Sequence, residues 1–293
     1  MIRTAISKGL SLSRACISAS NVRQFNDQQR RMAHWGYAQT ILGPEKWYLD
    51  YLIGKEGKRQ SPIDIKERDL DPKNFPSLDM CYDPSEITKV KNTGTSVKFF
   101  STGTKSGFTG GPFQHRQRLV QFHFHWGAEN NRGSEHTING RPTSAELHFV
   151  HYNDKYPDAT EAMKHPDGLS VLGVFIDVED TCNPAYQVLL HNVRKVRYAH
   201  TEAHVEGCLD VDGLFPSDKG AFAHYHGSLT TPPLTECVEW INFREITGIS
   251  QEQMDTFRGL YSTEEGKPAV PLVDNFRPVQ PIHGRTVYCR DCM

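Results

Sequence analysis

The stretch Leu119-Val-Gln-Phe-His-Phe-His-Trp126 decides the fold of this 293-residue chain. Side chains alternate between the two faces of a β-strand. In a strand, Gln121, His123 and His125 therefore point to the same side. The opposite side is wholly apolar, as a face packed on a core would be, and consists of Val120, Phe122, Phe124 and Trp126. The pattern predicts a buried strand with two histidines on one face.

A second run, Ala145-Glu-Leu-His-Phe-Val-His151, predicts another strand, with Glu146 and His148 on one face. If the two strands pair side by side, His148 brings a third imidazole to His123 and His125. Zinc binds imidazole nitrogens at about 2.0–2.1 Å, and three histidines leave one tetrahedral position open, which is typical of a catalytic site. The two runs therefore predict a catalytic zinc centre.

The polar residues beside these histidines support the metal interpretation. A metal-bound histidine usually donates its second N–H to a carboxylate, amide or carbonyl group. Gln121 precedes His123 by two positions and shares its face, and Glu146 stands in the same relation to His148. A single His-x-His pair is more often structural or exposed. His151 falls on the face opposite His148, so we expect it to be structural.

From Trp35 onward the chain is expected to form one unit built on a sheet. Short β-patterned runs recur, most of them separated by Gly, Pro, Asn and Asp, whereas long helical periodicity is scarce. Helices are expected over 183–195, opened by Asn-Pro, and over 250–260, opened by a serine N-cap. Strands are expected over 96–100, 117–126, 145–151, 169–178 and 235–243. The predicted fold class is mainly β (α+β), with peripheral short helices.

The composition excludes several classes of function. The chain has 33 basic and 35 acidic residues, a net charge of −2, so nucleic-acid or membrane-surface binding through bulk charge is not expected. Hydrophobic residues make up 37% of the chain, and no apolar run approaches the about 20 residues of a membrane span. The 14 histidines agree with a metal site.

Residues 1–31 differ in composition from the rest of the chain. They contain six basic residues, five serines and a single acid, Asp27. This pattern is typical of a transit peptide, whereas a secretory signal would need an uninterrupted apolar core. We therefore expect a mitochondrial location. A disordered basic leader is the alternative, and a second start at Met32 would give a cytoplasmic form.

The seven cysteines are scattered, apart from Cys289-Arg-Asp-Cys292 at the C-terminus. A single CxxC is a weak zinc signal. Residues 289–293 are therefore expected to be a short frayed tail with two reduced thiols.

Seven blocks of the sequence resemble the α-class carbonic anhydrases, and together they extend over residues 34–288. They are His34-Trp-Gly-Tyr37, Arg59-Gln-Ser-Pro-Ile-Asp64, Gln121-Phe-His-Phe-His-Trp-Gly127, Gly133-Ser-Glu-His136, Ala145-Glu-Leu-His148, Gly227-Ser-Leu-Thr-Thr-Pro-Pro233 and Asn275-Phe-Arg-Pro278. The resemblance implies one domain around a large, twisted, mostly antiparallel sheet of about ten strands. Zinc would lie at the base of a conical cleft.

The resemblance also implies the roles of individual residues. The implied zinc ligands are His123, His125 and His148. Their implied hydrogen-bond partners are Gln121, Glu146 and the backbone carbonyl of Asn275, which would serve His125. The implied catalytic residues are Thr230, Glu135 and Thr231. In this pattern Thr230 donates to Glu135 and accepts a hydrogen bond from hydroxide on zinc, which orients the nucleophile, and Thr231 adds a polar contact.

Further residues match the pocket of the family. The apolar wall that holds carbon dioxide would be Val150, Val171, Leu229, Val238 and Trp240, and ordinary core packing is the alternative for each. An apolar wall suits a substrate without charge and gives weak binding that permits fast release. Supporting hydrogen bonds would come from Tyr37, Ser61, His136 and Tyr225.

Two features depart from the family pattern. The usual proton-shuttle histidine should follow Asn92-Thr-Gly94, where this chain has Thr95. Lys98, on the same segment, is a poor substitute at an unperturbed pKa of about 10.4, and His34 is the first alternative shuttle to test. Secreted members have a disulfide where this chain has Lys55 and Leu234. This difference supports a reducing compartment.

The expected function is therefore the zinc-dependent, reversible hydration of carbon dioxide to bicarbonate and a proton through zinc-bound hydroxide, limited by proton export at Thr95. The alternative is a catalytically silent binding module of the same fold, against which the intact histidine triad argues. Sulfonamide and anion inhibitors are expected from the resemblance, and a monomer is expected.

Overall fold

The computed structural model describes residues 35–37 and 43–292. Contacts divide the chain into the units Met1–Trp35 and Gly36–Met293, and the second contains every element described below. The basic leader predicted over residues 1–31 lies outside the described residues. Within the described part, no helix has both the length and the apolar character needed to cross a membrane.

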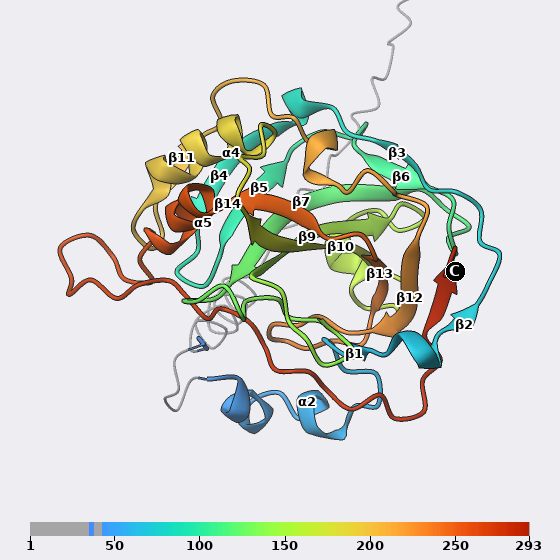
Figure 1. Cartoon of the computed structure of the whole chain (residues 1–293). Helices are drawn as coiled ribbons and strands as arrows, with labels where there is room; N and C mark the ends of the chain where they lie inside the picture. Colours follow the sequence, from blue (N-terminus) through green and yellow to red (C-terminus); the bar gives the residue numbers. More distant parts are fainter. Residues whose placement is uncertain (1–34, 38–42, 293) are drawn as a thin grey trace, which may run out of the picture. The chain divides into compact units, whose positions relative to one another are not determined.

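A 13-stranded sheet forms the centre of the second unit (Figure 1). Neighbouring strands follow the order β11 (Glu202–His204), β4 (Ile87–Asn92), β5 (Val97–Ser101), β7 (Gln117–Trp126), β9 (Ala145–Asn153), β10 (Leu169–Glu179), β13 (Val238–Phe243), β12 (Phe222–Gly227), β15 (Tyr288–Arg290) and β2 (Asp71–Pro72). Off this path, β14 (Thr247–Ser250) pairs with β10, and β6 (Gly107–Thr109) joins β3 (Asp79–Cys81) to β7. Strands β1 (Asp64–Ile65) and β8 (Thr137–Ile138) form a separate two-stranded sheet.

The large sheet confirms the predicted fold class and corrects its details. It has 13 strands rather than about ten, and it is mostly antiparallel, as predicted, but includes parallel pairs. The strands that hold the histidine runs, β7 and β9, are antiparallel, but β10 is parallel to both β13 and β14. Most of the strands that were not predicted have two to four residues, but β4 and β12 have six each, and none of them stands out as a periodic run in the sequence.

The helices are short and peripheral. Both helices predicted from capping signals are present, as α4 (Tyr186–Val193) and α5 (Gln251–Arg258). Ser250 is the N-cap of α5 and forms a capping box with Gln253, which satisfies two free backbone N–H groups. The other helical segments within the described residues are η1 (Pro44–Leu49), α2 (Ile53–Glu56), η2 (Glu67–Asp69), η3 (Pro84–Glu86), α3 (Ala159–Ala162), η4 (Arg194–Val196) and η5 (Asp212–Leu214).

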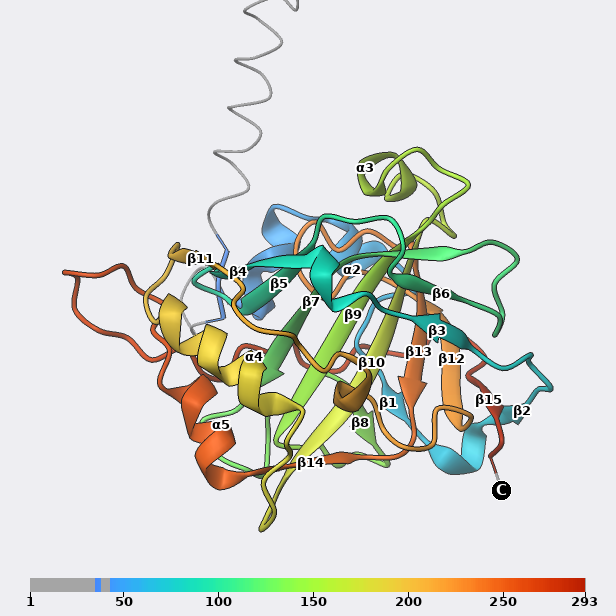
Figure 2. The same ribbon diagram turned by 90° about the horizontal axis from the view of Figure 1, so that it is seen from above.

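The main core lies on the face of the sheet that is opposite the histidines. Phe122 and Phe124 of β7 and Phe149 of β9 are buried there, together with Leu189 of α4 and Phe257 of α5. Figure 2 shows α4 and α5 side by side next to the strands of the sheet. The alternation read from the sequence therefore separates an apolar face covered by helices from a polar face.

The C-terminal prediction was wrong. Cys289 lies in β15, is buried, and forms a disulfide with Cys292. Strand β15 pairs with β12 and β2, and Arg290 donates to the carbonyls of Phe75 and Gly220. This end of the chain is thus part of the sheet, because its backbone groups find partners on both sides.

Candidate metal centre

Strand register brings the three predicted ligands together. His123 of β7 is the direct partner of His148 on β9, and directly opposed residues share a face with close Cβ atoms. His125 follows two positions along β7 on the same face. One ring nitrogen from each histidine lies within 4.8 Å of the other two, and all three side chains are buried. The group predicted from the sequence is therefore assembled by the fold.

Each imidazole is fixed by a hydrogen bond at its other nitrogen. The Nδ1 atoms of His123 and His125 lie 2.9 Å from Gln121 Oε1 and 2.7 Å from the Asn275 carbonyl oxygen, respectively. The Nε2 of His148 lies 2.7 Å from Glu146 Oε1. An acceptor at one nitrogen holds the proton there and leaves the lone pair of the other free for a metal. The triad thus presents two Nε2 atoms and one Nδ1 atom.

The remaining nitrogens fit a metal ion. Burial lowers the pKa of all three histidines, well below the usual value for His123 and His125, so neutral imidazole is favoured. His125 Nε2 is buried and has no hydrogen-bond partner among the described residues. A buried polar atom without a partner is costly. Three neutral imidazoles suit zinc, and the unpartnered nitrogen would be satisfied by it.

Glu146 is the hub of the surrounding network. Its Oε2 accepts hydrogen bonds from the backbone N–H groups of Glu135 and His136, at 2.9 and 2.8 Å. Its Oε1 lies 2.7 Å from both His136 Nδ1 and His148 Nε2. Burial alone would raise the pKa of Glu146, but the two histidines and these hydrogen bonds hold it well below its usual range. A charged carboxylate therefore anchors His148.

A second possible metal group, His136, Glu146 and His148, shares two residues with this network. Both imidazoles already lie within hydrogen-bond distance of the Glu146 carboxylate, so these atoms form a hydrogen-bonded chain. His136 Nε2 extends the chain to the Tyr225 hydroxyl at 2.6 Å, and that hydroxyl donates to Ser61 Oγ at 2.8 Å. Three of the predicted supporting residues thus belong to one network.

Gly173 leaves room for Glu146. It lies on β10 directly opposite His148. A Cβ atom at this position would lie 2.5 Å from Asn242 Nδ2 and 3.2 Å from Glu146 Oε1. The first distance is shorter than real Cβ contacts allow. Any side chain here would therefore displace Asn242 and crowd Glu146, the carboxylate that anchors His148.

Glu135 is a buried carboxyl group beside the triad. Burial raises its pKa well above the usual range, and hydrogen bonds from Thr230 and from the Arg277 backbone N–H oppose that shift. The Arg277 N–H donates to Glu135 Oε1 at 2.8 Å. The pKa of Tyr37 is also raised well above its usual value, first by burial and then by the charge of Glu135. The structure therefore brings Tyr37, Glu135 and Thr230 close together.

Asn275 links the metal centre to the turn that contains Thr95. Its backbone carbonyl accepts a hydrogen bond from His125. Its side-chain Oδ1 accepts the Trp126 N–H at 2.8 Å, and its Nδ2 donates to the Thr95 carbonyl at 3.0 Å. The turn itself is closed by Gly94 N–H donating to Asn92 Oδ1, and Gly94 has a positive φ of 81°. Thr95 is partly exposed there.

The predicted apolar wall forms one cluster. Val171, Val238 and Trp240 are buried in it, and Val150 and Leu229 pack against them. The Trp240 ring lies 4.8 Å from the His148 ring, centroid to centroid, so the cluster borders the triad. Thr231 follows Leu229 of this cluster by two positions in the sequence. Ser61 is connected to the same segment, because its Oγ accepts the Ser228 N–H.

Lys98, considered above only as a poor proton shuttle, is a neighbour of the triad, which the sequence did not predict. It lies on β5 directly opposite His123, and so extends the row formed by His123, His148 and Gly173. Its positive charge lowers the pKa of His123, after the larger effect of burial. The sequence contained no signal for this position, because the register of β5 on β7 is a tertiary property.

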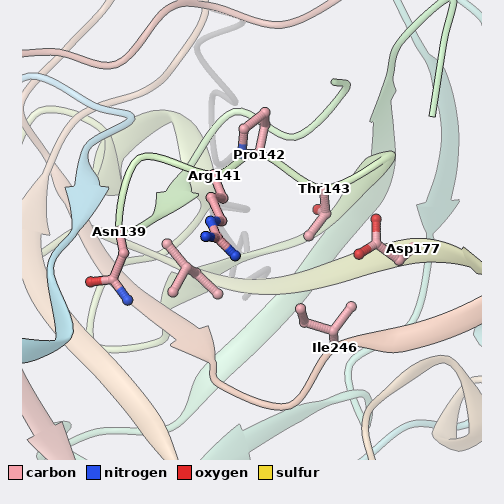
Figure 3. A pocket seen from close by; sticks show the side chains of 7 residues that line it. Asn139, Arg141, Pro142, Thr143, Asp177 and Ile246 are labelled. Atoms are coloured by element: carbon pink, nitrogen blue, oxygen red, sulfur yellow. The ribbon is translucent and has the colours of Figure 1, made fainter. Parts of the chain in front are cut away.

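A pocket of about 610 Å³ is lined by residues 138, 139, 141–143, 177 and 246, most of which Figure 3 labels. Its charged lining residues are Arg141 and Asp177, and Asp177 Oδ1 already accepts hydrogen bonds from Ser144. None of its seven lining residues belongs to the histidine centre, so we attribute no part of the metal site to it.

The comparisons with known proteins agree with this geometry. A family model described as eukaryotic-type carbonic anhydrase matches residues 42–291, a range that includes all three histidines. Carbonic anhydrase 3 of Rattus norvegicus is 41% identical over 258 residues, covering 86% of this chain and 96% of that protein. Carbonic anhydrase 1 of Mus musculus is 41% identical over 259 residues, covering 87% and 97%.

Proposed function

The chain belongs to the eukaryotic-type carbonic anhydrase family, and we propose that it hydrates carbon dioxide at the histidine triad with proton export as its slow step. Enzymes of this family are zinc-dependent lyases, so zinc is the cofactor that His123, His125 and His148 would hold. The observation that supports the proposal is the set of three buried, converging imidazoles, in which the Nε2 of His125 lies 3.4 Å from Glu135 Oε2 and has no hydrogen-bond partner among the described residues.

Zinc, when bound, supplies a Lewis acid that lowers the pKa of a coordinated water toward neutrality. The protein holds the three imidazoles in one tautomer through Gln121, Glu146 and the Asn275 carbonyl. Preorganised groups need little rearrangement during the reaction, which is how an active site stabilises a transition state.

Thr230 and Glu135 would set the direction of hydrogen bonding in the cleft. When the Thr230 hydroxyl donates its hydrogen bond to Glu135, an interaction that opposes the burial-driven rise of the Glu135 pKa, the Thr230 oxygen is left to accept a hydrogen bond from a donor in the cleft. Such a fixed acceptor orients the attacking oxygen toward the substrate. The apolar wall around Trp240 and Val171 would hold carbon dioxide, which carries no charge, beside it.

Thr95 is the reason to expect slow proton export. A donor with a pKa near 7 loses its proton to bulk water at only about 10³–10⁴ per second, even with diffusion-limited recombination, whereas turnover in this family reaches about 10⁶ per second. Histidine can relay protons because its pKa is about 6.5. The threonine hydroxyl has no pKa in that range. The turn that contains Thr95 is close to the metal centre, because Asn275 is hydrogen-bonded both to the Thr95 carbonyl and to His125.

The test is Thr95→His in the zinc-loaded enzyme, with Thr95→Gln as the matched control. We expect the histidine variant to raise the turnover number at least tenfold in dilute buffer and to weaken its dependence on imidazole-type buffers. The second-order rate constant for carbon dioxide, which is set before proton export, should stay within about twofold. A wild-type turnover number near 10⁶ per second that ignores buffer concentration would contradict the proposal and direct attention to His34.

The silent binding module is not favoured. Metal analysis of the purified protein distinguishes the zinc enzyme from the silent binding module, because a silent module does not require a bound zinc ion. A metal-free protein that regains neither zinc nor hydration activity after zinc addition would restore the alternative.

A further inference from the structure

Lys98 lies beside the metal centre as an amine without a counter-ion in the part of the chain that the structure describes. It lies on β5 in direct register with His123, and His123 is in register with His148. Opposed residues on antiparallel strands share a face. The lysine stem therefore starts from the same surface as the triad, one strand away.

No hydrogen bond or ion pair is formed by the Lys98 ammonium within residues 35–37 and 43–292. Lys91, its own cross-strand partner on β4, is different, because Lys91 lies 3.4 Å from Glu202. Glu202 also contacts Lys89. The carboxylate available on this edge is thus shared by two lysines, and Lys98 is left without one.

The position of Lys98 is costly for a cation. Its side chain is only partly exposed, and burial lowers its pKa. Its charge also acts on all three histidines, lowering the pKa of His123, His125 and His148. A zinc ion would add two positive charges at the same place. The two buried carboxyl groups nearby face other groups: Glu146 is hydrogen-bonded on both oxygens, and Glu135 accepts the Arg277 N–H at Oε1 while its Oε2 lies 3.4 Å from His125 Nε2.

We propose that Lys98 is a binding residue for small monovalent anions in the cleft, with the bicarbonate product as the physiological one. The proposal rests on the proposed function for its natural ligand. An ammonium is a compact charge on a flexible stem with three donors, so it can form a charge-assisted hydrogen bond to an anion held at the metal. Carbon dioxide has no charge and gains nothing from it. Lys98 would therefore distinguish product from substrate.

The experiment measures azide binding to zinc-loaded protein by titration calorimetry, with zinc content checked for each variant. Azide is a monovalent anion that is not a substrate. Lys98→Met keeps the apolar stem and removes the charge, and we expect azide affinity to fall about tenfold, the scale of one hydrogen bond to a charged group. Lys98→Arg should retain affinity within about threefold, because the charge remains.

The matched control is Lys91→Met, one strand further along the same row, which should change azide affinity less than twofold. The proposal is overturned if Lys98→Met binds azide within twofold of wild type, or if Lys91→Met weakens binding equally. Inhibition of hydration by bicarbonate should follow the same order of variants. If the wild type binds zinc and azide but does not hydrate carbon dioxide, the proposed function fails while the anion site stands.

Discussion

Gly173 is the residue at which a single methyl group should disturb the metal centre. Its Cβ would lie 2.5 Å from Asn242 Nδ2 and 3.2 Å from Glu146 Oε1. We expect Gly173→Ala to lower the free energy of unfolding by about 1–3 kcal/mol, as overpacking of a rigid interior does, and to weaken zinc binding. Urea denaturation and competition with a chelator measure the two effects.

Gly259 is the matched control for that substitution. It ends α5 with an ordinary φ of −76°, and the nearest atoms to an added Cβ lie at 3.4 Å. Gly259→Ala should leave stability unchanged or raise it by up to about 1 kcal/mol. Equal behaviour of the two alanine variants would show that the space around Glu146 is not restrictive.

His148 should be indispensable for holding zinc. We expect His148→Ala to retain less than a tenth of the zinc of the wild type after dialysis and to lose hydration activity, because two histidines do not make a stable catalytic site. His191→Ala, on the exposed surface of α4, is the control and should keep one zinc per chain. Metal analysis by mass spectrometry gives the answer, and full occupancy in His148→Ala would refute the ligand set.

The residues of the site differ in how far the sequence could predict them. His123, His125, His148, Gln121 and Glu146 follow from alternation within two strands, a local property. Asn275 is 150 residues from His125, and only the family resemblance pointed to its carbonyl. Lys98 and Gly173 are neighbours of the triad through strand register, which pairing across the sheet determines. No local pattern in the sequence specifies that pairing.

At the scale of elements, β12 and β13 place a carboxylate between two histidines. Glu239 Oε2 lies 2.7 Å from His224 Nε2, and Oε1 lies 2.6 Å from His226 Nδ1. Hydrogen bonding to Glu239 raises the pKa of His226, although burial, Arg59 and Lys73 oppose it. Burial would raise the pKa of Glu239, but its two histidine partners lower it.

These shifts predict a pH window for stability. A raised pKa at His226 stabilises the fold below the unfolded value of about 6.5 and ceases to do so as the pH rises through the folded pKa. The lowered pKa of Glu239 stabilises the fold above its unfolded value of about 4.3 and ceases to do so as the pH falls through the folded pKa. The pair should therefore contribute most between about pH 5 and 6.5.

The measurement is urea denaturation of His226→Gln at pH 5.5 and pH 9. Because the His226 side chain is 53% exposed, we expect a loss of less than about 1 kcal/mol at pH 5.5 and a smaller loss at pH 9. His283→Gln, at an exposed position, should show no such difference. A larger loss at pH 9 than at pH 5.5 would show that the pair stabilises the fold at high rather than low pH, and would contradict the raised pKa of His226.

Elements with strong local signals were predicted well, and those held by distant partners were not. Strand β7 begins and ends where alternation placed it, at Gln117 and Trp126, and α5 begins after its predicted Ser250 cap. Strand β15 has three residues. Two of them, Cys289 and Arg290, fall in the segment 289–293 that the sequence predicts to be a frayed tail, because the pairing of β15 with β12 and β2 connects residues far apart in the sequence.

At the scale of the whole molecule, the sequence predicted a sheet-based unit but undercounted its strands. The mixed character arises where β10 meets β13 and β14 in parallel and where β15 meets β2 in parallel, and all three pairings join segments far apart in the sequence. Apolar alternation indicates that a strand has one buried face. It does not indicate the direction of its neighbour, which depends on the path of the chain between them.

The intact chain has a further property that the folded unit does not explain, the basic segment 1–31. We propose that it directs the protein into mitochondria, because six basic residues and a single acid match the composition of a transit peptide.

The full chain with a C-terminal tag should co-purify with mitochondria and be shortened there, as fractionation and immunoblotting would detect. Replacing the six basic residues by glutamine should leave the chain outside and unprocessed, because the segment would lose its charge. A chain started at Met32 should stay in the cytoplasm. Unprocessed wild-type protein spread through intact cells would contradict import and favour a basic extension without an address.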